Sequence, residues 1–182
     1  MNNCQNTRER VIAFLLFLTS EKCFETLEKF VAPEKLGYEL CRIWFDDIYA
    51  PSERYLETLK GDYSEQKTRD FEECFDVEEL VEMERFHRFF ELRLDMLSKK
   101  HKTRAAYPQS NSWKNLIKHA KYLVRELEPA ADRRRILLEK NVELAFKQNG
   151  ELPPPSHWKM LIDPKNVTSE SKNGRNGETE KS

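Results

Sequence analysis

Histidine and glutamate at helical spacing are the first residues in this chain that could do chemistry, because together they bind metals or move protons. The chain has four histidines, and only His87 has a glutamate three residues before it, Glu84, with Glu91 one turn further on. A carboxylate-bridged metal site in a helical bundle needs two Glu-x-x-His units and two more glutamates. The sequence supplies half of such a site, so we expect His87 at a helix surface or boundary and no bound metal or other cofactor.

Motifs for nucleotide binding and hydrolysis are missing from the sequence. It contains no GxSxG, GxxxxGK[ST] or GxGxxG segment, which are the usual patterns of a hydrolase nucleophile or a phosphate-binding loop. A non-catalytic protein is therefore favoured. A helical metal-dependent enzyme acting through Glu84, His87 and Glu91 is the third hypothesis.

Carboxylates and tyrosines gather around a predicted corner between two helices. Tyrosine supplies rigid contact area with a polar tip, and carboxylates select a basic partner. The group therefore predicts a protein-binding surface, comparable in charge to the inhibitor or immunity proteins that cover a nuclease. The alternative is that the tyrosines pack the corner and the carboxylates are solvated around them. We name this group the acidic corner; its members are Asp46, Asp47, Tyr49, Glu53, Tyr55, Asp62 and Tyr63.

Four cations recur at intervals of four, three and four residues, which places them on one side of a predicted helix. We name them the basic ridge: Lys114, Lys118, Lys121 and Arg125. Arg133, Arg134 and Arg135 follow on the next predicted helix. These cations could contact phosphates, which makes nucleic-acid binding the alternative function. A solvated helix face explains the same pattern.

The charges are divided along the chain, although the net charge is only −1. Residues 33–97 contain 9 basic and 18 acidic residues, and residues 98–148 contain 13 basic and 5 acidic residues. Two arrangements remain open. Either the two segments face each other and neutralise, or they form separate surfaces of opposite sign that can attract partners.

The N-terminal region bears on the cellular compartment. An apolar run at residues 11–18 follows Arg8 and Arg10, but no small-x-small cleavage site follows it, and a bilayer needs about 20 apolar residues. The run predicts a buried helix. The cysteines at positions 4, 23, 41 and 74 form no CxxC pair, which favours thiols in a reducing compartment over a disulfide framework. We therefore expect a cytoplasmic protein that does not associate with membranes.

The whole pattern predicts an all-α fold. With 182 residues and five glycines, the chain suits a helical bundle of about five or six helices. Helix starts are predicted at Pro33, at Asp76 with Glu79 as a capping box, and at Pro129, while residues 113–127 show the clearest helical periodicity. We expect a single domain over residues 1–150, a Pro-rich spacer with a short apolar patch over 151–164, and a disordered tail over 165–182.

These observations favour a binding or adaptor protein that engages a basic partner protein through the acidic corner. Nucleic-acid binding through the basic ridge is the alternative. Partner identity and oligomeric state are left open by the sequence.

Overall fold

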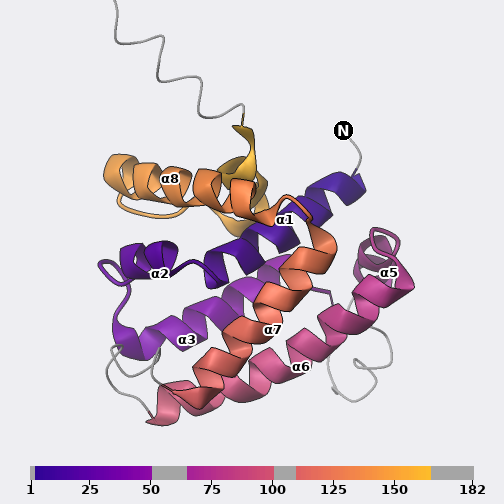
Figure 1. Cartoon of the computed structure of the whole chain (residues 1–182), viewed down its shortest axis with the longest axis horizontal. Coiled ribbons are helices and arrows are strands. Elements are labelled where there is room, and N and C mark those ends of the chain that lie inside the picture. The colour runs from indigo at the N-terminus through magenta and orange to yellow at the C-terminus, as the bar shows by residue number, and fades with distance from the viewer. Residues whose placement is uncertain (1–2, 51–64, 101–109, 165–182) are drawn as a thin grey trace, which may run out of the picture.

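A computed structural model describes residues 3–50, 65–100 and 110–164 of the chain. Within these ranges the ordered elements are helices (Figure 1). In chain order they are α1 (Asn3–Leu18), α2 (Glu21–Leu27), α3 (Pro33–Arg42), the π-helical segment η1 (Ile43–Ile48), α5 (Glu65–Glu72), α6 (Val77–Lys100), α7 (Asn111–Leu127), α8 (Ala131–Asn149) and the 3₁₀ segment η3 (Pro155–Ile162).

The all-α prediction is confirmed, but the predicted number of helices is too low. The described ranges hold seven α-helices and η3, with η1 continuing α3. One of the additional helices is α2, which begins after Ser20 as an element separate from α1. The Ser20 hydroxyl accepts a hydrogen bond from the backbone N–H of Cys23 at 3.2 Å. This N-cap starts a new helix because it satisfies a donor that has no partner within the helix.

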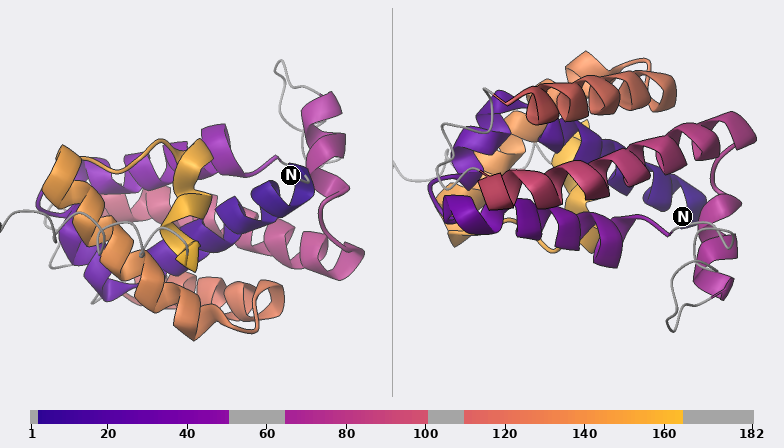
Figure 2. Two further views of the ribbon diagram at one scale, coloured as in Figure 1. Left: turned by 90° about the horizontal axis from the view of Figure 1, so that it is seen from above. Right: turned by 90° about the horizontal axis from the view of Figure 1, so that it is seen from below.

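Helix α1 is the centre of the fold. Every residue from Val11 to Leu18 is buried, so all sides of this part of the helix are covered by protein. The covering elements include α2, η1, α7, α8 and η3, and the ribbon views show α1 running between them (Figures 1 and 2). The prediction of a buried helix is confirmed. No helix in the described ranges combines the length and the apolar character needed to cross a bilayer.

An aromatic cluster around Phe14 joins α1 to three other elements. The Phe14 ring lies 5.0 Å from that of Trp44 on η1, 5.8 Å from that of Phe90 on α6, and 6.2 Å from that of Trp158 on η3. Aromatic pairs at such distances add to the stabilisation from burial alone. The cluster therefore holds segments from the beginning, middle and end of the described chain around one side chain.

The segment after residue 150 belongs to this core. It was predicted to be a spacer with a short apolar patch, but Trp158, Leu161 and Ile162 of η3 are buried against α1 and α8. The Trp158 indole N–H donates to the Pro153 carbonyl at 2.9 Å, and the Asn141 side chain of α8 donates to the Leu161 carbonyl at 2.9 Å. The tail predicted over residues 165–182 lies outside the described residues.

Several predicted helix boundaries are confirmed. At the start of α6, the Glu79 N–H donates to the Asp76 carboxylate at 2.8 Å and the Asp76 N–H donates to the Glu79 carboxylate at 3.0 Å. This is the reciprocal pair of a capping box. Helix α3 begins at Pro33, and α8 ends before Gly150, whose φ of 72° is the left-handed conformation that favours glycine.

The N-terminal end of α1 is linked to the turn before α6, and here the prediction of thiols is wrong for two of the four cysteines. Cys4 and Cys74 form a disulfide with Cα atoms 4.7 Å apart, because the fold brings together two residues that are far apart in sequence. Beside it, the Arg8 guanidinium donates two 2.6 Å hydrogen bonds to the Glu79 carboxylate. Disulfides are typical of oxidising compartments, so the cysteines no longer support a cytoplasmic location, which stays a prediction without that argument.

Removing the disulfide is expected to lower the free energy of unfolding by about 4 kcal/mol, because a cross-link between residues 70 apart restricts the unfolded chain. The variant is Cys4→Ser with Cys74→Ser, and denaturant unfolding is the measurement. A thiol reductant should destabilise wild-type protein by the same amount and leave the double variant unchanged. Cys41→Ser, at a partly buried cysteine outside the disulfide, is the control. A wild-type protein that does not respond to reductant would contradict the prediction.

Candidate functional site

The acidic corner is divided by the fold. Tyr49 is buried and its ring stacks on that of Trp44, with centroids 5.1 Å apart and planes 6° apart. Tyr49 is therefore a core residue, and its expected place on a binding surface is wrong. Asp47 lies 3.6 Å from the Arg42 guanidinium, while the Asp46 side chain is exposed. The other four predicted members, Glu53, Tyr55, Asp62 and Tyr63, lie outside the described residues, so the role of the acidic corner stays a prediction.

The structure does not bring the three candidate metal-binding residues together. His87 is completely buried rather than at a helix surface or boundary, because its face of α6 packs toward η1. Glu84 bonds to Arg88 on the outer side of the same helix, and Glu91 is exposed. Within the part of the chain that the structure describes, no group of three His, Cys, Asp or Glu side chains is placed to hold a metal ion.

His87 is instead part of an aromatic cluster. The Trp44 indole N–H donates a 3.2 Å hydrogen bond to Nδ1 of His87, so Nδ1 is the unprotonated nitrogen and Nε2 carries the proton. The rings of Phe45 and Tyr49 lie 4.8 Å and 4.5 Å from the imidazole. Burial, assisted by the nearby positive charge of Arg88, lowers the pKa of His87 to about 4. The residue is a neutral structural histidine at physiological pH.

The basic ridge borders a groove between the end of α1, α2 and α7. The groove has a volume of about 860 Å³. Its floor is apolar, and there the rings of Phe24 from α2 and Trp113 from α7 meet with centroids 4.8 Å apart. The complete lining is Leu18, Thr19, Ser20, Glu21, Phe24, Glu25, Trp113, Lys114, Ile117, Lys118, Lys121, Tyr122 and Arg125.

All four residues of the basic ridge lie along one wall of this groove. Each is exposed, and none forms a side-chain ion pair with another described residue. Between them Tyr122 leaves 51% of its surface exposed, and Ile117 is partly buried against the core. The wall therefore presents cations that have no ion-pair partner in the described part of the chain, next to apolar surface, which is more than a solvated helix face offers.

Helix α6, most of which belongs to the acidic segment 33–97, lies on another side of α7. His119 of α7 contacts Phe89 of α6, with ring centroids 4.7 Å apart, which identifies the side of α7 that faces α6. Lys121 follows two residues later, about 200° around the helix, on the groove side. On α6 itself, Glu82 pairs with Arg85 at 2.6 Å. The basic ridge and α6 thus face apart, and the ridge is not neutralised across the α6–α7 contact.

The three consecutive arginines of α8 do not extend the ridge. Arg134 lies 3.2 Å from Glu128 and 3.6 Å from Glu9, and Arg135 lies 3.2 Å from Asp132. Arg133 is exposed. None of the three lines the groove, so the structure separates them from the four cations with which they were grouped.

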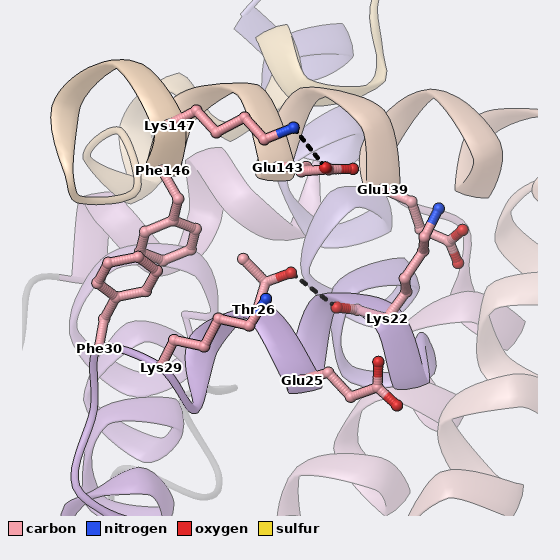
Figure 3. A pocket seen from close by; sticks show the side chains of 9 residues that line it. All are labelled: Lys22, Glu25, Thr26, Lys29, Phe30, Glu139, Glu143, Phe146 and Lys147. Atoms are coloured by element: carbon pink, nitrogen blue, oxygen red, sulfur yellow. Dashed lines mark hydrogen bonds and ion pairs between the residues drawn. The ribbon is translucent and has the colours of Figure 1, made fainter.

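A second hollow, of about 390 Å³, lies between α2 and α8 (Figure 3). At one end the rings of Phe30 and Phe146 stack with centroids 4.2 Å apart and planes 5° apart. Lys147 pairs with Glu143 at 2.7 Å. The charged residues around the hollow are three lysines and three glutamates, Lys22, Lys29, Lys147, Glu25, Glu139 and Glu143. The formal charges around the hollow therefore cancel.

The sequence pattern indicated the cations of the groove but not its apolar floor. Trp113 and Ile117 fit the apolar stripe of a packed helix, so their type and spacing predicted core positions. The one sequence feature that could have indicated a groove is Ile117, which sits among Lys114, Lys118 and Lys121 on the same side of the helix.

Comparisons of the chain with models of protein families, with curated proteins and with solved structures found no match. A functional proposal for this protein therefore rests on the shape and chemistry of the groove.

Acid should destabilise the protein through His87. Its pKa is about 4 in the folded chain and about 6.5 when unfolded, so the unfolded state binds the proton first. The neutral imidazole makes its full contribution to the free energy of unfolding above pH 6.5. This contribution, about 3 kcal/mol, is lost as the pH falls toward 4. Denaturant unfolding at pH 4 to 7.5 measures this slope.

His87→Asn is the matched variant, because the asparagine oxygen can accept the Trp44 hydrogen bond but the side chain does not titrate. The free energy of unfolding of this variant at neutral pH will be lower than that of wild type. Both proteins contain the same carboxylates, so the effect of carboxylate titration cancels when the two are compared. The difference in stability between the two proteins should therefore shrink as the pH falls. A constant difference across the range would show that His87 does not control the acid response.

Proposed function

We propose that this protein is a non-catalytic protein-binding module that holds a helical segment of a partner in the groove between α2 and α7. The observation that carries the proposal is the combination of an open apolar floor with a wall of four cations that have no ion-pair partner among the described residues. An amphipathic helix buries its apolar stripe in such a groove, and charges at the edge of the stripe meet the wall.

The dimensions of the wall suit a short helix. From Lys114 to Arg125 the ridge follows α7 for eleven residue steps, which is about 16 Å or three turns. A partner helix of three to four turns can therefore lie beside it. Four cations at this spacing favour acidic residues along the facing edge of the partner, since opposite charges steer association and fix orientation.

A protein partner explains the groove better than nucleic acid does. Phosphate contacts account for cations, but they leave the apolar surface around Trp113 and Ile117 uncovered. A helical partner uses both features. The predicted class of a non-catalytic binding protein is thus kept, while the proposed surface moves from the acidic corner to the basic ridge and its groove.

The proposal is tested with a display library of 18-residue peptides that carry a fixed helical leucine stripe and randomised flanking positions. Purified full-length protein should select peptides from it. Ile117→Ala and Tyr122→Ala should each weaken the selected peptides about tenfold, because they remove apolar contact area from the groove. Fluorescence anisotropy of labelled peptides measures the affinities.

Two exposed residues elsewhere supply matched controls. Ile136 on α8 is 69% exposed and Tyr38 on α3 is 67% exposed, and neither lines the groove. Ile136→Ala and Tyr38→Ala should leave peptide affinity unchanged. The proposal fails if no peptide is selected, or if selected peptides ignore the groove variants. It also fails if an RNA or DNA oligonucleotide binds at low salt and neither groove variant affects it.

A further inference from the structure

The two walls of the groove carry charges of opposite sign. The α7 wall presents the basic ridge, whereas the facing wall, formed by α2, presents Glu21 and Glu25. Both glutamates are exposed, and neither forms an ion pair with a described residue. Between the walls lie the apolar side chains of Leu18, Phe24 and Ile117. The groove is therefore electrostatically asymmetric across its width as well as apolar along its floor.

We infer that the partner of this groove is a helix with acidic residues along one edge of its apolar stripe and basic residues along the other, and that these edges fix the direction in which the helix binds. This inference rests on the proposed helix-binding function and adds the partner's charge pattern. A helix that is acidic on both edges would satisfy the ridge but place like charges against Glu21 and Glu25. A helix that is basic on both edges would do the reverse.

The direction follows from geometry. Reversing a helix in a groove, with its apolar stripe still facing the floor, exchanges its two edges between the two walls. A helix with unlike edges therefore has one direction in which both edges meet opposite charges and one in which both meet like charges. Like charges across an interface disfavour the wrong arrangement, so the groove selects one direction for each sequence.

Four synthetic 18-residue peptides with an identical leucine stripe test this inference. Their edges are Glu/Lys, Lys/Glu, Glu/Glu and Lys/Lys. The two peptides with unlike edges should bind about fivefold more tightly than Glu/Glu, because a favourable contact with Glu21 and Glu25 replaces repulsion. Lys/Lys should bind most weakly, because it opposes four cations. Raising the salt concentration should reduce these differences.

Binding direction is read with a nitroxide on the peptide N-terminus and amide spectra of isotope-labelled protein. For one unlike-edged peptide the spin label should broaden amides near Lys114, and for the other it should broaden amides near Arg125. The inference would be overturned if both unlike-edged peptides broadened amide signals at the same end of the groove. It would also be overturned if each peptide broadened the signals near Lys114 and near Arg125 equally.

Charge reversal on the protein gives an independent measurement. Glu21→Lys with Glu25→Lys makes both walls basic, so this variant should prefer Glu/Glu over the unlike-edged peptides. Glu126→Lys, at an exposed glutamate of α7 outside the groove lining, should keep the wild-type order. If all four peptides bind wild type equally and lose affinity with Ile117→Ala, the groove binds helices but the inference is wrong. If none binds, the proposed function fails with it.

Discussion

The burial of one helix on all sides determines the architecture of this protein. A surface helix needs cover on one face, but residues Val11–Leu18 of α1 are apolar around the whole circumference, and each is buried. Fully burying a large apolar side chain is worth roughly 1.5–3 kcal/mol, so the seven large apolar side chains of this run, with Ala13, drive the other elements to surround α1. Helices α2, α7 and α8 and the segments η1 and η3 all contact it, and the packing of each against the others follows from this shared centre.

The groove arises where α1 ends and α2 begins. At Thr19 and Ser20 the chain leaves α1 and begins α2 with a new N-cap, so α2 diverges from the axis of α1. Helix α7 packs against α1, and Leu18, Phe24 and Trp113 form the floor of the space between α2 and α7. The charged residues that are excluded from the core then become the walls, positive on α7 and negative on α2.

Local patterns predicted the parts of this structure that depend on local physics. The capping box at Asp76, the periodicity of α7 and the apolar run of α1 each involve residues within a few turns, and each agrees with the structure. Features that depend on distant residues were not accessible. The Cys4–Cys74 disulfide joins residues 70 positions apart, and Tyr49 turns inward after η1, where the wider π-helical turn shifts the register of the helix. The groove depends on the separation of α2 and α7, and this separation cannot be read from the sequence of either helix alone.

The contact between Phe14 and Trp158 has a consequence for how the protein is made in the cell. The central helix leaves the ribosome well before η3, which covers it beside Trp158. Until more than 140 further residues have been synthesised, the apolar surface of α1 has incomplete cover. Exposed apolar surface of this kind leads to aggregation during synthesis. The nascent chain therefore depends on rapid collapse of its earlier helices, or on chaperones, to protect its own centre.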